Sequence, residues 1–278
     1  MIKLVAIDLD GTLLGADHES VTRRTADALH AAQAAGIQLV ISTGRMYRNI
    51  PEPVREACKT DYVISSNGAA VWDTRRDAIV YGKPIRYAKA GQIIGLLNRA
   101  HVYYEMYYQG ASYADRSCYD AINRDLLPDW YEKRIRVHSK PVDNALNFAV
   151  VGKRDIEKFN IPFLREESYR KLWSEIAALG GLELVSSLEN NIEVNAAGAD
   201  KGDALMHLCN QLGIDRTEVL AIGDSGNDVQ MLHYAGVSVA MGNATPHVKT
   251  LAGYVCPSNE EDGVAIVLEG LVQKYRGA

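Results

Sequence analysis

The chain lacks a cysteine pattern, a signal-like leader and a long hydrophobic run. Its cysteines stand far apart and form no CxxC pair: Cys58, Cys118, Cys209 and Cys256. This spacing predicts neither a zinc site nor a disulfide framework, and it suits four reduced thiols. No apolar run approaches the roughly 18 residues of a membrane span, and residues 1–7 are too short for a signal peptide. We therefore expect a cytoplasmic protein with no membrane partner.

The chain also lacks an excess of positive charge. The 278 residues include 30 Lys and Arg against 35 Asp and Glu, a net charge of −5, and no long basic tract. This balance argues against nucleic acid as a partner, because binding to the phosphate backbone needs clustered cations. With 47% hydrophobic residues the composition is globular, and the length predicts two domains at about 150 residues each. A monomer and a small homo-oligomer fit the sequence equally well.

Short apolar runs alternate with amphipathic segments near both ends of the chain. Continuous runs such as 4–7 are typical of parallel strands that are buried on both faces. The pattern predicts strands at 4–7, 37–43, 62–65, 219–222 and 237–241. It predicts helices at 22–35, 53–58, 203–212, 229–234 and 263–274. Right-handed crossovers assemble such units into a doubly wound, Rossmann-like α/β core.

The middle of the chain differs from its flanks. Residues 84–190 hold 14 of the 21 aromatic side chains and a net charge of +1, so the flanks carry about −6. Alternating patterns predict strands at 101–108 and 146–151, and amphipathic patterns predict helices at 88–100 and 167–179. We therefore expect an α+β domain at 84–190, inserted into a core formed by 1–83 and 191–278.

Two segments of this insert invite more than one interpretation. The alternation of basic and apolar residues at 133–140 favours a solvated strand edge, with a substrate clamp as the alternative. Four tyrosines fall on opposite sides of the strand predicted at 101–108, so at most two can face one ligand: Tyr103, Tyr104, Tyr107 and Tyr108. Packing within the insert is the simpler role for each of them, although tyrosine also suits ligand binding.

A pair of carboxylates follows the first predicted strand. Asp8 and Asp10 lie where ligands bind in doubly wound sheets, outside the carboxyl ends of the strands. Residues i and i+2 on extended backbone point the same way, and Gly11 permits a sharp turn. Two close carboxylates repel each other unless a cation or a shared proton is present. Helix capping is the alternative for this motif alone.

Two further motifs suit an anion. Thr43-Gly44-Arg45 follows the second strand and offers a hydroxyl, a backbone amide and a cation, although Thr-Gly also serves as an ordinary turn. Lys201 opens the helix before the late strand, and on its own it is most simply a solvated surface lysine. Only the combination with the other motifs makes an anion site the better interpretation.

The loop after the late buried strand suits a hard cation. Asp224 and Asp228 stand four residues apart with Asn227 beside them, and oxygen ligands of this kind favour Mg²⁺. The loop lacks the length and the distal glutamate of a calcium-binding EF-hand. A chance cluster of small polar turn residues is the alternative.

Together with Ser66-Asn67-Gly68-Ala69, these motifs resemble the signature motifs of the haloacid dehalogenase-like (HAD) superfamily. The insert between the second and third motifs resembles the cap of the Cof-like, type IIB subfamily. The resemblance covers both core segments, and no catalytic position is missing. It implies a Mg²⁺-dependent phosphatase that hydrolyses small phosphorylated metabolites, foremost sugar phosphates, through an aspartyl-phosphate.

The resemblance also implies residue roles. Asp8 corresponds to the nucleophile and Asp10 to the general acid and base. Mg²⁺ would be bound by the Asp8 carboxylate, the Asp10 carbonyl and Asp224. The phosphoryl group would be bound by backbone amides around Leu9 and by Thr43, Gly44, Lys201 and Asn227. Asp228 and Arg45 would contact these groups without binding the substrate themselves, and Asp228 would support the metal or Lys201.

Two other functions remain open at this point. A phosphotransferase such as a phosphohexomutase would pass the phosphoryl group to a sugar instead of water. A catalytically idle protein that binds metabolites would use the same scaffold without turnover. The complete set of catalytic positions favours the phosphatase.

Overall fold

The computed structural model describes residues 1–120, 127–186 and 190–276 and divides into two compact units. The core unit comprises Met1–Tyr81 and Asp200–Ala278, and the cap unit comprises Gly82–Ala199. The return from cap to core therefore lies later than the predicted 190/191 boundary. Residues 121–126, 187–189 and 277–278, which the predicted domains include, lie outside the described residues.

The core unit contains an eight-stranded sheet in the order β14-β13-β12-β1-β2-β3-β4-β5. Its strands are β1 (Leu4–Ile7), β2 (Gln38–Ser42), β3 (Tyr62–Ser65), β4 (Ala70–Asp73), β5 (Ala78–Gly82), β12 (Val219–Gly223), β13 (Val237–Ala240) and β14 (Tyr254–Val255). β14 to β3 run parallel, with β1 between β2 and β12. The predicted parallel core is confirmed, and the antiparallel pairing of β4 with β3 is an addition to it.

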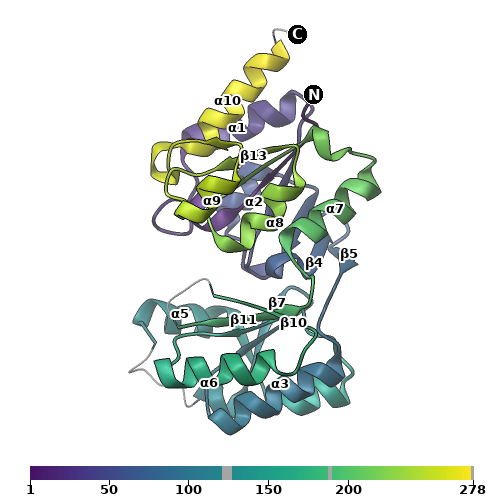
Figure 1. Cartoon of the computed structure of the whole chain (residues 1–278), viewed down its shortest axis with the longest axis vertical. Helices are drawn as coiled ribbons and strands as arrows, with labels where there is room; N and C mark the ends of the chain where they lie inside the picture. The colour runs from purple at the N-terminus through teal and green to yellow at the C-terminus, as the bar shows by residue number, and fades with distance from the viewer. Residues whose placement is uncertain (121–126, 187–189, 277–278) are drawn as a thin grey trace. The chain divides into compact units, whose positions relative to one another are not determined.

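Helices cover this sheet on both faces, as Figure 1 shows for α1, α10, α7 and α8. The helices are α1 (Arg23–Ala34), α2 (Glu52–Cys58), α7 (Lys201–Leu212), α8 (Val229–Tyr234), α9 (Pro246–Leu251) and α10 (Gly263–Arg276). Short helical turns are η1 (Leu9–Leu13), η2 (Tyr47–Asn49), η3 (Ser66–Gly68), η5 (Arg216–Glu218), η6 (Gly226–Asp228) and η7 (Asn259–Glu261). Thr22 caps α1 and Asp200 caps α7, each by accepting a backbone N–H in the first turn.

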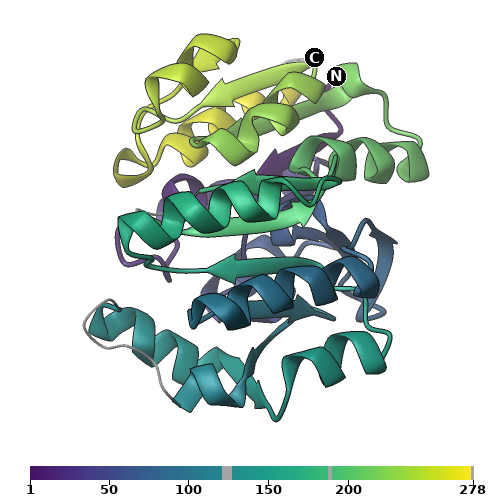
Figure 2. The same cartoon turned by 60° about the horizontal axis from the view of Figure 1, so that its bottom comes forward.

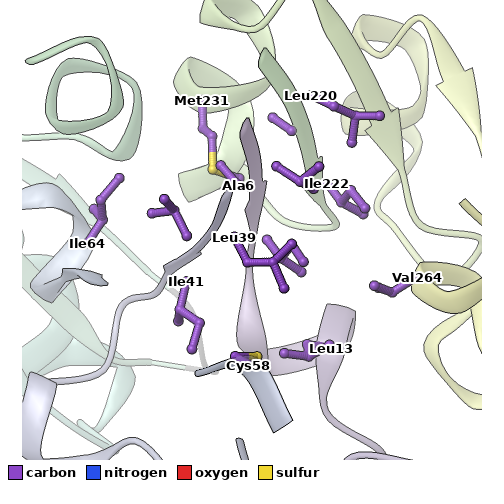
Figure 3. Close-up of a cluster of buried hydrophobic side chains, with 14 of the residues drawn as sticks. Ala6, Leu13, Leu39, Ile41, Cys58, Ile64, Leu220, Ile222, Met231 and Val264 are labelled. Atoms are coloured by element: carbon purple, nitrogen blue, oxygen red, sulfur yellow. The ribbon is translucent and has the colours of Figure 1, made fainter. Parts of the chain in front are cut away.

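The hydrophobic core of this unit explains the continuous apolar runs. Every residue of β1 is buried, because helices lie on both faces of the sheet. Figure 3 shows buried side chains from four adjacent strands, with Ala6 and Ile64 on one face of the sheet and Leu39, Ile41 and Ile222 on the other, together with Met231 of α8 and Val264 of α10. This packing fixes the carboxyl ends of the strands, where the polar motifs begin.

The cap unit is built on a second sheet in the order β10-β11-β9-β6-β7-β8. Its elements are α3 (Tyr87–Ala100), β6 (Glu105–Tyr108), β7 (Ala111–Asp115), α4 (Arg116–Asp120), α5 (Asp129–His138), β8 (Ser139–Val142), η4 (Asn147–Val151), β9 (Lys158–Ile161), α6 (Glu166–Ala177), β10 (Leu182–Val185) and β11 (Ile192–Ala196). All neighbouring strands are antiparallel except β7 and β8. β11 belongs to this sheet, although the sequence assigned 191–196 to the core.

The two faces of the cap sheet have opposite character. Met106, Phe159 and Val194 lie in one row and pack against α3 and α6, which run side by side along this face in Figures 1 and 2. Glu105, Asn160 and Glu193 lie in the next row and point to the other face, where Tyr131 of α5 accepts a hydrogen bond from Asn160. Tyr104 packs in the apolar cluster, as predicted for a tyrosine within the insert.

Three secondary-structure predictions in the cap are wrong. Residues 147–151 form the helical turn η4, because its only buried residue, Ala149, gives no alternating face. Residues 133–138 belong to α5, where Tyr131 and Ile135 are buried at the i, i+4 spacing of a helix. The strand predicted at 101–108 begins only at Glu105, because His101 adopts a left-handed conformation that ends α3.

The cysteines and the helices bear on two other expectations. All four cysteines are free, in agreement with the absence of a disulfide pattern. In the described part of the chain, none of the helices combines the length and hydrophobicity that crossing a membrane requires.

Candidate active site

A buried lysine joins two carboxylates at the carboxyl ends of β1 and β12. Asp8 directly follows β1, and Lys201 is the first residue of α7. The Lys201 Nζ donates to Asp8 Oδ1 at 2.6 Å and to Asp228 Oδ1 at 2.7 Å, and the lysine has no exposed surface. The alternative of a solvated surface lysine is wrong. A cation buried this completely is tolerated because carboxylates compensate it.

This cluster has more negative than positive charge. Burial raises the pKa of Asp8 well above its ordinary value, and the neighbouring Asp228 and Asp224 raise it further, while Lys201 opposes them. Burial alone would lower the pKa of Lys201, but Asp228 and Asp8 outweigh burial and raise it. The lysine therefore stays protonated, and ionisation of Asp8 would be favoured by a second cation.

The carboxylates of Asp8, Asp224 and Asp228 each place an oxygen within 4.8 Å of the others. Asp228 is fully engaged, because its Oδ2 accepts the backbone N–H groups of Asp224 and Ser225 at 3.0 Å and its Oδ1 binds Lys201. The Asp224 Oδ1 accepts a hydrogen bond from Thr12 at 2.9 Å. Within residues 1–120, 127–186 and 190–276, Asp8 and Asp224 each retain one oxygen without a hydrogen bond.

These two oxygens fit a hard divalent cation. Carboxylate oxygens are preferred ligands of Mg²⁺, and an ion beside them would offset the surplus of negative charge. Burial and the neighbouring Asp228 raise the pKa of Asp224 to about 6, so this carboxylate also gains from a cation. Gly11 leaves room at this point, since a Cβ there would lie 2.6 Å from Asp224 Oδ2. When bound, Mg²⁺ would supply charge neutralisation for an incoming phosphate.

Asp10 has different partners from Asp8. Arg45 donates to both of its carboxylate oxygens at 2.8 and 2.6 Å, and the His18 Nδ1 lies 3.2 Å from Oδ1. Burial alone would raise the pKa of Asp10, but the hydrogen bonds with His18 and Arg45 outweigh burial and lower it. The hydrogen bond to Asp10 in turn raises the pKa of His18. The sequence motif predicts that both aspartates point toward one spot. In the structure they bind different partners, Lys201 for Asp8 and Arg45 for Asp10.

The Thr43-Gly44-Arg45 turn packs against the η3 turn. The Thr43 Oγ1 accepts the Arg45 N–H at 3.1 Å, and Thr43 is fully buried. The N–H of Asn67 donates to the Thr43 carbonyl at 3.1 Å, and the Asn67 Oδ1 accepts from Asn227 Nδ2 at 3.1 Å. The predicted phosphate-binding residues Thr43, Gly44 and Asn227 are thus linked through Asn67.

Sequence reasoning gave no role to three side chains that complete this site. Thr12 orients Asp224, His18 contacts Asp10, and Asn67 joins two of the motifs. Thr12 and Asn67 stand inside motifs that the sequence had already marked, whereas His18 lies in a loop with no distinguishing pattern. Leu9 is buried in the first position of η1.

Several known proteins are similar to this chain over nearly its whole length. The family model described as haloacid dehalogenase-like hydrolase matches residues 5–268. The chain belongs to this family. It is 32% identical to phosphatase YwpJ of Bacillus subtilis, over 98% of this chain and all of that protein. It is 30% identical to pyridoxal phosphate phosphatase YbhA of Escherichia coli, over 95% and 96% of the two chains.

One further relative and two solved structures are also similar to this chain. The chain is 30% identical to 5-amino-6-(5-phospho-D-ribitylamino)uracil phosphatase YcsE of Bacillus subtilis, over 95% and 93% of the two chains. A haloacid dehalogenase-like hydrolase structure from B. subtilis is 32% identical, with a TM-score of 0.81 over 97% and 100% of the chains. The HAD subclass IIB sugar phosphatase BT4131 shares the fold at 23% identity, with a TM-score of 0.78 over 97% and 98%.

Proposed function

We propose that the protein is a Mg²⁺-dependent phosphatase that hydrolyses small phosphorylated metabolites through an aspartyl-phosphate on Asp8. The observation that carries this proposal is the buried Lys201, which holds Asp8 and Asp228 beside Asp224. A phosphate dianion can approach an ionised aspartate only where cations compensate both. Lys201 supplies one positive charge, and Asp8 and Asp224 would hold the metal that supplies the rest.

The proposed reaction has two steps. An Asp8 carboxylate oxygen attacks phosphorus while the bond from phosphorus to the ester oxygen breaks, and Asp10 gives a proton to the departing alcohol. Water then attacks the phosphorus, Asp10 accepts a proton from it, and the bond between Asp8 and phosphorus breaks. Thr43, the Gly44 amide, the amides around Leu9 and Lys201 would bind the phosphoryl oxygens, with Asn227 beside them.

Arg45 sets a condition on this mechanism. It holds Asp10 ionised in the structure, whereas an acid needs a proton. A bound phosphate dianion competes with Asp10 for guanidinium hydrogen bonds. We infer that substrate binding loosens the ion pair and lets Asp10 carry the proton for the leaving group.

The test is phosphate release from p-nitrophenyl phosphate by the full chain in Mg²⁺. Asp8→Asn is expected to abolish release, because an amide cannot form the acyl phosphate, while the variant still folds. Chelation should silence the wild type and added Mg²⁺ should restore it. Undiminished release by Asp8→Asn, or turnover without any divalent metal, would refute the proposal.

The substrate preference for sugar phosphates is part of the same proposal. The names of two relatives specify a ribitylaminouracil phosphate and pyridoxal phosphate, so similar identity accompanies different substrates. A panel should therefore hold both compounds together with hexose and pentose phosphates. Free phosphate from a hexose phosphate, with no isomeric sugar phosphate formed, would separate hydrolysis from phosphoryl transfer.

A further inference from the structure

The turn after β3 has an unusual backbone. Ser66, Asn67 and Gly68 all adopt positive φ angles, of 54°, 58° and 95°. Left-handed conformations are costly for residues with a Cβ, and consecutive ones persist only where surrounding contacts hold them. Such strain often accompanies a functional requirement. The contacts of this turn show which requirement it meets.

The turn at Ser66–Gly68 donates two backbone hydrogen bonds to the Thr43-Gly44-Arg45 segment. The Ser66 N–H donates to the Arg45 carbonyl at 2.9 Å, and the Asn67 N–H donates to the Thr43 carbonyl at 3.1 Å. Between these two bonds, the Asn67 Oδ1 lies against Gly44, where an added Cβ would approach it to 2.6 Å. The Asn67 side chain therefore fixes the position of the Gly44 backbone.

The same oxygen reaches the loop after β12. The Asn67 Oδ1 accepts from Asn227 Nδ2 at 3.1 Å, and the Asn227 Oδ1 accepts from the Ser225 hydroxyl at 2.7 Å. One buried oxygen thus contacts two segments that are far apart in sequence. Asn67 itself is 4% exposed, which limits the motion of this link.

We propose that Asn67 is a positioning residue that holds Gly44 and Asn227 at the separation a phosphoryl group requires. This inference rests on the proposed function, because it assigns Gly44 and Asn227 to phosphate. Asparagine suits the task, since it tolerates the left-handed backbone better than most residues and carries an acceptor oxygen. Asn67 acts through its two neighbours, and contact with the substrate is not part of its role.

The test compares Asn67→Gly with wild type by titrating inorganic phosphate calorimetrically in Mg²⁺. Glycine keeps the left-handed backbone and removes only the carboxamide. We expect phosphate affinity to fall about three- to tenfold, as for one lost hydrogen bond. The Mg²⁺ concentration for half saturation without phosphate should stay unchanged, because Asp8 and Asp224 are not partners of Asn67. Lys59→Gly, at another left-handed position with φ 40°, is the matched control and should bind phosphate like wild type.

A double variant tests whether Asn67 acts through Asn227. If it does, Asn67→Gly combined with Asn227→Ala should weaken phosphate binding by less than the product of the two single effects. Multiplicative losses would overturn the link to Asn227. The positioning role would be overturned if Asn67→Gly bound phosphate within twofold of wild type. It would also be overturned if Asn67→Gly lost Mg²⁺ affinity by the same factor as phosphate affinity and had a lower melting temperature, because the variant would then be damaged as a whole.

Turnover of p-nitrophenyl phosphate separates this inference from the proposed function. Phosphate binding that weakens in Asn67→Gly, in a protein without turnover, would refute the phosphatase proposal and support the positioning role. If Asp8→Asn abolishes turnover while Asn67→Gly binds phosphate like wild type, the phosphatase proposal is supported and the positioning role is refuted. A wild type that neither binds phosphate nor turns over p-nitrophenyl phosphate would refute both.

Discussion

Replacing Lys201 by methionine should destabilise the core unit and stop turnover. The change removes a fully buried cation and leaves Asp8 and Asp228 facing each other without compensation. Breaking a buried ion pair from one side costs about 3–5 kcal/mol. At about 2 °C per kcal/mol for a chain of this size, the melting temperature should fall by about 6–10 °C. The fall should be smaller at low pH, because the pKa of Asp8 is already raised and a proton on Asp8 would relieve part of the repulsion with Asp228.

Calorimetry with and without Mg²⁺ measures this effect. Mg²⁺ should raise the melting temperature more in Lys201→Met than in wild type, since the ion would replace part of the missing positive charge. Release of phosphate from p-nitrophenyl phosphate should fall at least about 100-fold, the usual loss when one group that stabilises transition-state charge is removed.

The cap offers a matched control. Lys158 is 2% exposed and its Nζ lies 2.7 Å from Glu193, so Lys158→Met also breaks a buried ion pair. It should lower stability comparably and leave turnover of this small substrate within about threefold of wild type. A Lys201→Met variant with unchanged melting temperature and turnover would refute the electrostatic reasoning. If Lys201→Met and Lys158→Met both lose turnover, the loss in Lys201→Met is explained by impaired folding rather than by the missing charge in the site.

Two other predictions concern Asp224 and Gly11, at the proposed metal site. The pKa of Asp224 is raised to about 6 in the folded, metal-free protein. In the unfolded chain this carboxyl loses its proton near pH 4. The free energy of unfolding that this group contributes therefore falls as pH rises from about 4 to about 6. Metal-free Asp224→Asn should therefore be more stable than wild type at pH 7 by up to about 3 kcal/mol, with no gain below about pH 4, as urea unfolding would measure. Gly11→Ala should cost about 1–2 kcal/mol, because φ is +77°, and should raise the Mg²⁺ requirement by displacing Asp224; an unchanged activation curve would contradict this.

Much of the core could be predicted because its strands are buried on both faces. The runs at Leu4–Ile7 and Val219–Gly223 are apolar throughout, and a polar motif follows each one. The hairpin to β4 could not be predicted, because it depends on three consecutive left-handed residues. The cap was harder, since half-buried segments such as α5 carry short patterns that fit both a strand and a helix.

The candidate site was predictable in composition but not in geometry. The motifs named the carboxylates, yet the burial of Lys201 depends on Asp8, 193 residues away in the sequence. The opposite environments of Asp8 and Asp10 likewise depend on Lys201 and Arg45, which no local pattern pairs with them. Ionisation is set by three-dimensional neighbours, and for this reason the pKa of Asp10 could not be deduced from the motif.

The central position of β1 has a consequence for synthesis of the chain. β1 pairs with β2 on one side and with β12 on the other, so the core sheet stays open until Val219–Gly223 has left the ribosome. The cap sheet needs only residues up to Ala196 and can close earlier. The nascent core must therefore keep one edge of β1 unpaired while the cap folds, which exposes it to aggregation. The hydrogen bond between Asp8 and Lys201 joins a segment made before the cap to one made after it, and Asp224 and Asp228 follow later still, so the site forms only after the whole cap has been synthesised.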